Sequence, residues 1–397
     1  MRHSEQVALI RRILDHMQAG TTDRGAVAKS PVARYLSPER LAREQQMIRG
    51  MPVMIGASSC VAQPGDWFSH DLSGVPIVVA RGQDGVLRAF INACRHRGAR
   101  LVEGSGGTAR RNFICPYHSW TYDLDGALRG LPHPQEFPDL DRAQHSLVAL
   151  QVAEACGLVW VVPTPGAAID IRAWLGPMAD DLQSFGYERF IAHDTRRFDS
   201  AHDWKLVADA NLEAYHFQYL HRASIAPLFQ DNRMVADAFG DHWRIILPKE
   251  SIGELRAQAP AQWNLAQHCN IIYYFFPNLM FLFIGDHATV LSVWPRGVGA
   301  STIDAVTLIP EPPATDKARQ YWDKNVKIFW EALMEDFGLM DSMQSTFASG
   351  ANTHLTFGRS EFCAAGFEAS VERYLDAQPV LRKAVTRLST SSRAAPA

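Results

Sequence analysis

The sequence predicts an α+β protein of more than one domain: N-terminal helices, an all-β domain, and a second domain of helices on an antiparallel sheet. The chain has 397 residues, which exceeds the size that one hydrophobic core usually serves. Its composition, 47% hydrophobic and 20% charged, is that of an ordinary globular protein. Residues 50–163 consist of short β-like runs between Gly, Pro and Asp, whereas the first 45 residues show helical periodicity.

The N-terminal 45 residues are expected to be helical. Ser4 can cap a first helix that ends at Gly20, and Ser37 followed by a proline marks the start of a second helix. In the β-rich segment we expect strands at residues 76–80, 87–91 and 157–162. The run of Pro, Gly and Ala that begins at Pro163 is the expected linker.

The second domain is expected to open with a helix over residues 171–185 and a strand over residues 189–198. Two apolar runs, residues 270–276 and 288–294, have the composition of buried strands in one antiparallel sheet. A long helix with apolar flanks follows and carries Asp336. The expected divisions are residues 1–45 (helical segment), 46–164 (all-β domain), 165–388 (helices and sheet) and 389–397 (disordered tail).

Two short pairs of cysteine and histidine predict a metal centre in the all-β domain. Cys94 and His96 form the first pair, and Cys115 and His118 form the second after a gap of 18 residues. Two thiolates on one iron and two imidazoles on the other are the ligand set of a Rieske [2Fe–2S] cluster. A structural zinc site is the alternative, but zinc fingers usually place two cysteines before two histidines. The mixed order favours the cluster, which accepts single electrons.

The two loops resemble those of a known family. The sequences Cys-Arg-His-Arg-Gly at 94–98 and Cys-Pro-Tyr-His-Ser-Trp-Thr-Tyr-Asp-Leu-Asp-Gly at 115–126 are similar to the cluster loops of Rieske non-haem iron oxygenase large (alpha) subunits, the ring-hydroxylating dioxygenase family. Ser119 stands where the family usually has glycine, and the gap between the loops is slightly longer than usual. Neither change removes a ligand. The resemblance covers residues 45–350 and implies a catalytic domain of helix-grip type.

A second metal site is predicted downstream, where His216 and His221 lie five residues apart. Two histidines and one carboxylate form the facial triad of non-haem Fe(II) enzymes and leave positions open for dioxygen. Residues five apart on a regular helix are about 140° out of line, so the helix must bulge or end near His221. From the residues alone Glu213 is a candidate third ligand, because it shares a helical face with His216.

The resemblance assigns Glu213 a different role. In the family, the acidic residue at this position hydrogen-bonds an iron-bound histidine, here His216, and the second Rieske histidine, here His118, of a neighbouring chain. A carboxylate behind a ligating imidazole fixes the orientation of the ring. The resemblance places the third iron ligand on a late helix at Asp336. The fallback candidates for this ligand are Glu335 and Asp341.

The predicted function is that of a terminal oxygenase that oxidises a small organic substrate with O₂. The resemblance implies a separate NAD(P)H-dependent reductase, with or without a ferredoxin, and a ring of subunits, most often a homotrimer. No Gly-x-Gly-x-x-Gly turn follows a strand, so no dinucleotide site is expected in this chain. We favour mono- or cis-dihydroxylation of an aromatic substrate, for example an aromatic acid. The alternative is oxidative N- or O-demethylation, or oxidation of a quaternary amine.

Substrate contacts are the least specific part of the pattern. Arg222, Arg233 and Arg244 are candidates for pairing with a substrate carboxylate, although surface and interface contacts are the more common role of arginine. The apolar run from Tyr273 to Phe283 either lines an aromatic pocket or, as is more usual, forms sheet core. A pure Rieske electron carrier is the rival from another class, and it would need neither the second domain nor the second pair of histidines.

Charge and hydropathy argue against several partners. The net charge of −3 gives no electrostatic basis for binding nucleic acid or an anionic membrane. The first residues lack the apolar core of a signal peptide, and no uncharged apolar run reaches 18 residues. Together with scattered cysteines that have the pattern of free thiols, these features predict a cytoplasmic protein. The cysteines outside the cluster loops are Cys60, Cys156, Cys269 and Cys363.

Overall fold

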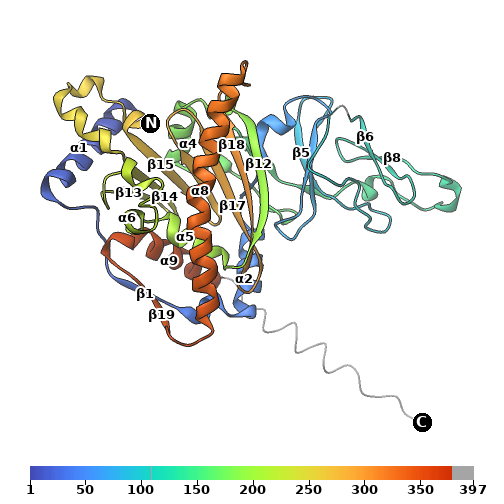
Figure 1. The fold of residues 1–397 in the computed structure, drawn as a ribbon. Helices are drawn as coiled ribbons and strands as arrows, with labels where there is room; N and C mark the ends of the chain where they lie inside the picture. Colours follow the sequence, from blue (N-terminus) through green and yellow to red (C-terminus); the bar gives the residue numbers. More distant parts are fainter. Residues whose placement is uncertain (109, 378–397) are drawn as a thin grey trace, which may run out of the picture.

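The computed structural model describes residues 1–108 and 110–377, and the tail expected to be disordered lies outside the described residues. The predicted α+β class is confirmed: three small sheets build the β-rich segment, and helices pack on both faces of a larger antiparallel sheet. Figure 1 shows the β-rich segment on one side of the molecule and the larger sheet on the other. No helix among the described residues is long and apolar enough to cross a membrane.

The first helix, α1 (His3–Ala19), ends where the sequence predicts. Its last turn is followed by Gly20 at φ 65°, a left-handed conformation in which glycine carries no steric penalty. The expected cap at Ser4 is wrong. Arg2 occupies the capping position and makes no side-chain hydrogen bond there, so the helix begins two residues earlier than a Ser4 cap would allow.

The second helix, α2 (Pro38–Arg49), starts at the predicted signal, because the Ser37 hydroxyl accepts a hydrogen bond from the backbone N–H of Arg40 at 3.1 Å. The segment between the two helices was also expected to be helical, but it contains no α-helix, only the short 3-10 helix η1 (Val32–Tyr35). It contains β1 (Ala28–Pro31), which pairs antiparallel with β19 (His354–Phe357). The partner strand lies near the other end of the chain, so no local pattern announces the pairing.

Three antiparallel sheets form the β-rich segment, and the expected strands at 76–80, 87–91 and 157–162 are confirmed as β4, β5 and β11. One sheet contains β3 (Trp67–His70), β4 (Ile77–Arg81), β5 (Leu87–Ile91) and β9 (Ala149–Leu150). Another contains β6 (Asn112–Ile114), β7 (Thr121–Asp123) and β8 (Leu128–Gly130). The third contains β2 (Val53–Ala57), β10 (Val152–Ala155) and β11 (Leu158–Val161).

The helix expected over residues 171–185 is two helices, α3 (Ile171–Leu175) and α4 (Pro177–Ser184). Gly176 lies between them at φ 56°, a positive angle at which the helix cannot continue. The proline that follows has no N–H to donate, so it starts the second helix. The Gly-Pro signal for this break is present in the sequence and outweighs the helical periodicity around it.

The larger sheet has seven antiparallel strands, and the strands expected at 189–198, 270–276 and 288–294 are confirmed in it as β12, β15 and β17. In spatial order the strands are β12 (Ile191–Ser200), β18 (Ala300–Ile309), β17 (Ala288–Gly297), β16 (Leu279–Phe283), β15 (Cys269–Phe275), β14 (His242–Pro248) and β13 (Val235–Phe239).

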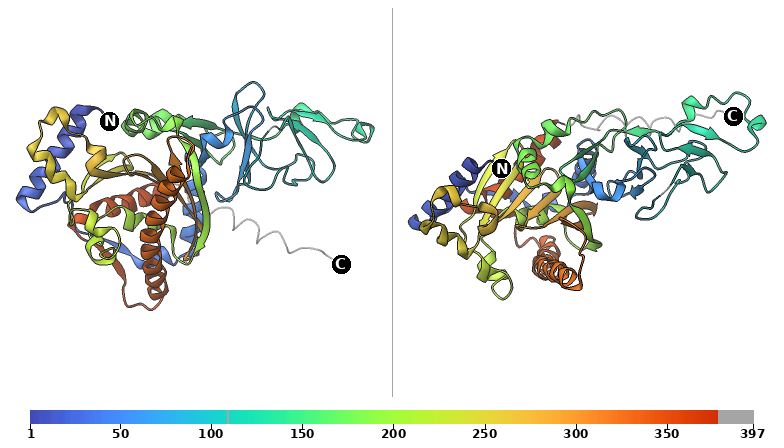
Figure 2. Two further views of the ribbon diagram at one scale, coloured as in Figure 1. Left: turned by 45° about the horizontal axis from the view of Figure 1, so that its top comes forward. Right: turned by 90° about the horizontal axis from the view of Figure 1, so that it is seen from above.

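Helices cover both faces of this sheet (Figure 2). Residues of α5 (Trp204–Asn211), α8 (Asp316–Phe347) and α9 (Phe362–Ala377) share one hydrophobic core with one face of the sheet. Residues of α1, α4 and the short α7 (Leu265–His268) share a second core with the other face. The long helix α8 therefore crosses the face that will carry the candidate site.

Burial of His242 on β14 predicts an acid-sensitive fold. Its Nδ1 accepts from the Phe276 N–H at 3.0 Å and its Nε2 lies 2.7 Å from the Trp174 carbonyl oxygen, so the neutral ring satisfies both contacts. Burial lowers the pKa of His242 to about 4. Between this value and the ordinary one the unfolded chain binds more protons, so the free energy of unfolding must fall as the pH is lowered.

We expect this histidine to remove up to about 3 kcal/mol of stability between pH 7 and pH 4, measured by urea unfolding. A His242→Gln variant should be less stable at pH 7 but lose less on acidification. An equal slope in the variant and the parent protein would contradict the assignment.

Candidate metal centres

The two cluster loops are closed by the same turn. The Gly98 N–H donates to the Cys94 carbonyl oxygen at 2.8 Å, and the Ser119 N–H donates to the Cys115 carbonyl oxygen at 3.0 Å. Gly98 and Ser119 both have positive φ, 78° and 55°. That conformation suits glycine, which explains why glycine is usual at the position of Ser119. The serine keeps the turn, and both cysteines remain buried.

The paired histidines fit a metal cluster between the loops. The rings of His96 and His118 lie 4.7 Å apart, centre to centre, and the Nδ1 atom of each is buried without a hydrogen-bond partner among the described residues. Buried imidazole nitrogens are normally satisfied, so two unsatisfied ones at one place indicate a missing ligand. His96 also stacks on Trp120 at 4.9 Å, which fixes the plane of its ring. Two thiols and two such nitrogens are the donor set that a [2Fe–2S] cluster needs.

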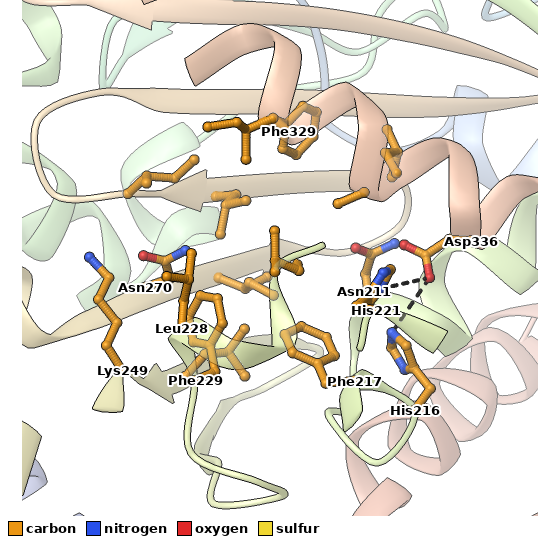
Figure 3. A pocket seen from close by; sticks show the side chains of 18 of the residues that line it. Asn211, His216, Phe217, His221, Leu228, Phe229, Lys249, Asn270, Phe329 and Asp336 are labelled. Carbon is orange, nitrogen blue, oxygen red and sulfur yellow. Dashed lines mark ion pairs between the residues drawn. The ribbon is translucent and has the colours of Figure 1, made fainter. Parts of the chain in front are cut away.

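The second site brings His216, His221 and Asp336 together, as Figure 3 shows. The Nε2 atoms of His216 and His221 lie 3.5 Å and 3.2 Å from the same oxygen, Oδ1 of Asp336. One donor atom from each residue lies within 4.8 Å of the other two. The three donors thus surround one point and match the two-histidine, one-carboxylate pattern of a non-haem Fe(II) site.

A break in the helix makes this geometry possible. The helix α5 ends at Asn211, and a single turn, α6 (Phe217–Leu220), lies between His216 before it and His221 after it. The expected end of the helix near His221 is therefore confirmed. The long helix α8 supplies Asp336 from the opposite side. Two segments more than 100 residues apart in the chain meet at this point.

The electrostatics of the site favour a positive charge. Burial opposes protonation of His221, but hydrogen bonds to Asp336 and Glu335 outweigh it and raise the pKa of His221 above its ordinary value. Asp336 is largely buried, and a buried carboxylate requires a cationic or hydrogen-bonding partner. A divalent cation between the three donors meets this requirement.

Each histidine of the triad is oriented by a hydrogen bond between its Nδ1 atom and a carboxylate. Glu213 accepts a hydrogen bond from Nδ1 of His216, and Glu335 accepts one from Nδ1 of His221 at 2.6 Å. These contacts leave the Nε2 atoms free to face Asp336 and fix the orientation of both rings. The contact of Glu335 was missed from the sequence, in which it was only a fallback ligand. The other fallback, Asp341, lies outside the triad and contacts Nδ1 of His202 at 2.7 Å.

A cavity of about 540 Å³ opens beside the triad. Alternate residues of two neighbouring strands line it, among them Ile272 on β15 and Met280 on β16. Their sequence neighbours Tyr273 and Phe281 point into the core on the other face of the sheet. The interpretation of the run 273–283 as sheet core therefore holds for these aromatic residues. On α8 the lining residues follow helical spacing: Asn325, Ile328, Phe329, Ala332, Leu333 and Asp336.

The arginines proposed to bind a substrate carboxylate do not line this cavity. The guanidinium of Arg244 is buried and bonded to three carboxylates, those of Glu5, Asp181 and Asp237. Arg222 and Arg233 are also absent from the cavity wall. An arginine whose donors are occupied by carboxylates of its own chain is not available to a ligand.

Two family models match the chain. The first, described as the Rieske [2Fe-2S] domain, covers residues 51–149, and the second, described as the ring hydroxylating alpha subunit (catalytic domain), covers residues 188–377. The first match contains both cluster loops, and the second contains the triad. Together they account for the cluster and the non-haem iron that the sequence predicts.

Relatives and solved structures agree with these families. The chain is 34% identical over 192 residues to the carnitine monooxygenase oxygenase subunit of Acinetobacter baumannii, a match over 47% of this chain and 50% of that protein. It is 27% identical over 325 residues to the chloroplastic choline monooxygenase of Beta vulgaris, over 79% and 69% of the two chains. The chain thus spans about half the length of the carnitine monooxygenase relatives it matches.

Two solved structures have the same fold. The quaternary ammonium Rieske monooxygenase CntA in complex with L-carnitine has a TM-score of 0.76 at 23% identity, over 88% of this chain and 96% of that one. Naphthalene 1,2-dioxygenase from Rhodococcus has a TM-score of 0.74 at 20% identity, over 94% and 99%. At these identities the likeness concerns the fold alone.

Replacing Asp336 by asparagine should remove iron from the mononuclear site only. The amide carries no charge to balance a cation, so we expect iron to fall by about one atom per chain while the cluster is retained. Iron and acid-labile sulfide analysis measures both. Asp341→Asn is the matched control on the same helix, and it should keep its iron. Iron loss from the control with full retention in Asp336→Asn would contradict the assignment of the ligand.

The sequence, the fold and the comparisons lead to one family. The cluster loops lie within the matched Rieske domain, and the triad lies within the matched catalytic domain. Solved Rieske oxygenases share the fold over most of the chain. The chain belongs to the large (alpha) subunits of the Rieske non-haem iron oxygenases.

Proposed function

We propose that this chain is the terminal oxygenase subunit of a multicomponent monooxygenase that oxidises a quaternary ammonium or other N-methylated compound with O₂. The observation that carries the proposal is the triad of His216, His221 and Asp336 in the wall of an apolar cavity. The sequence alone favoured an aromatic substrate. The carnitine, choline and glycine betaine monooxygenases among the relatives favour the alternative, and we adopt it.

The residues divide the work between two metal sites. Cys94, His96, Cys115 and His118 would hold the [2Fe–2S] cluster, and the triad would hold the Fe(II). The bound metals supply single-electron transfer and O₂ activation. The chain itself orients the imidazoles through Glu213 and Glu335 and provides a cavity wall of mostly apolar side chains.

Electron delivery is proposed to occur between neighbouring chains. The cluster loops flank β6, at the end of the molecule away from α6 and the triad, and both Figure 1 and Figure 2 show this separation. A neighbour in a ring, such as a homotrimer, would bring its own His118 to Glu213. The structure of a quaternary ammonium Rieske monooxygenase with the same fold gives insight into inter-subunit electron transfer in that protein, which supports this arrangement.

The electron donor and compartment are proposals of the same kind. A separate NAD(P)H-dependent reductase, directly or through a ferredoxin, would reduce the cluster, as expected for an oxygenase subunit. All six cysteines of the chain are free of disulfides, which supports a reducing compartment such as the cytoplasm.

Hydroxylation of an aromatic ring is the second candidate. Three phenylalanines, Phe217, Phe229 and Phe329, line the cavity together with aliphatic side chains, and this lining would accept a ring. A trimethylammonium group can use the same aromatic faces through cation–π contact. The identity of the reaction product therefore distinguishes ring hydroxylation from oxidation of a quaternary amine.

The function is tested by turnover with defined substrates. The iron-loaded protein is mixed with a Rieske reductase, NADH and O₂, and either trimethylammonium compounds or aromatic acids are added. The proposal expects substrate-dependent O₂ uptake and a dealkylated amine or aldehyde product, identified by mass spectrometry. Ring hydroxylation with no oxidation of any quaternary amine would overturn the proposal in favour of the second candidate.

Substituting Glu213 by glutamine tests the bridge. The amide can still contact His216 but carries no charge, so we expect both metals to remain bound while turnover falls by roughly 100-fold. Single-turnover reoxidation of the reduced cluster should slow in parallel. Asp341→Asn serves again as the control and should turn over normally. Near-normal turnover of Glu213→Gln would rule out the bridge.

A further inference from the structure

Two polar side chains that have no side-chain partner among the described residues, Lys249 and Asn270, lie at the end of the cavity opposite Asp336. Figure 3 shows both at one end of the cavity, with the triad at the other and apolar side chains between. The triad end already has an assigned role in holding a cation. The polar groups at the far end have none.

Lys249 has a cationic group without a carboxylate partner. It follows β14, where its backbone N–H donates to the His268 carbonyl oxygen at 2.8 Å and fixes the start of the side chain. No carboxylate among the described residues lies within ion-pair distance of its Nζ, and no described residue accepts a hydrogen bond from it. Burial lowers the pKa of Lys249, and the nearby Cys269 and Asp286 offset this effect only in part.

Asn270 supplies an unsatisfied amide beside it. The residue is 9% exposed, and its buried Oδ1 has no hydrogen-bond partner in the described part of the chain. It pairs across the sheet with Leu247, and Lys249 lies two residues beyond Leu247 on the same face. The Oδ1 is an acceptor, and Figure 3 shows it on the side of Lys249, whereas the Nδ2 is a donor from which a carboxylate oxygen can accept a hydrogen bond.

The other titratable groups near this end are already engaged. Glu250 accepts a hydrogen bond from the Gln230 amide at 2.5 Å, and His287 contacts Asp286 through Nδ1 at 2.7 Å. At the other end of the cavity the carboxylate of Asp336 is assigned to the metal and that of Glu213 accepts from His216, so neither of them neutralises Lys249. An anionic group on a ligand is therefore drawn toward Lys249.

We infer that Lys249 and Asn270 bind a carboxylate of the substrate at the end of the cavity away from the metal site. The ammonium group of Lys249 donates to one carboxylate oxygen and the amide of Asn270 donates to the other, while the body of the substrate extends along the apolar wall toward the triad. This inference rests on the proposed function and narrows its substrate class to carboxylates. It makes Lys249 a determinant of specificity.

The test measures binding to the metal-loaded, full-length protein without turnover. Isothermal titration calorimetry compares 4-(trimethylammonio)butanoate with its methyl ester, and 4-phenylbutanoate with its methyl ester. We expect at least one acid to bind at least tenfold more tightly than its ester. The acid that does so shows whether the cavity accepts a trimethylammonium or a phenyl group. Acid and ester of equal affinity in both pairs, or no binding of either acid, overturn the inference without any variant.

Variants then assign the effect to the lysine. Lys249→Met keeps the length of the side chain and should weaken binding of the acid at least tenfold while leaving the ester unchanged. Lys249→Arg should restore most of the affinity. Lys327→Met, at an exposed lysine of α8 outside this cavity, is the matched control and should bind as the parent protein does. Equal loss for acid and ester in Lys249→Met would contradict the assignment.

Failure of this inference can be separated from failure of the proposed function. If the acids bind through Lys249 but no quaternary amine is oxidised, the carboxylate site stands and the reaction assignment falls. If quaternary amines are oxidised but affinity does not depend on the carboxylate, the reaction assignment stands and the site falls.

Discussion

The structure depends on one point at which the imidazoles of His216 and His221 meet the largely buried carboxylate of Asp336. Because a charge in this position needs a cation, the chain must deliver three donors to one point and hold them there. This requires α5 to stop short of His216 and α8 to be long enough to cross the sheet. The start of α5 is fixed in turn by Lys205, whose buried ammonium group contacts Asp203 at 2.8 Å and Glu44 at 3.1 Å.

The two faces of the antiparallel sheet have different roles, one in the hydrophobic core and one in the cavity wall. Along β15 and β16 one set of side chains fills a core against α1 and α4, and the alternate set faces α8 and forms the cavity wall. The cavity then has two unlike ends, with the metal triad at one and Lys249 and Asn270 at the other. This polarity would orient an elongated substrate before any chemistry begins.

Most of the metal ligands could be predicted from local spacing, whereas contacts between segments far apart in the chain could not. Both cluster pairs and the pair His216 and His221 follow from short motifs, because each motif carries its ligands within a few residues. Asp336 came from the family resemblance, since the local pattern offered Glu213 as a third ligand. The pairing of β1 with β19, the contact of Glu335 with His221 and the position of Lys249 in the cavity depend on segments that meet only after folding. The break at Gly176 is different: its signal was local, and helical periodicity concealed it.

The central claim is that one chain carries two iron centres of different kinds. Anaerobic iron and sulfide analysis, combined with electron paramagnetic resonance of the dithionite-reduced protein, tests it most directly. The account predicts about three irons and about two sulfides per chain, with the low average g value of a histidine-ligated cluster. About two irons with the cluster signal alone would contradict the mononuclear site, and zinc in place of iron would contradict both centres.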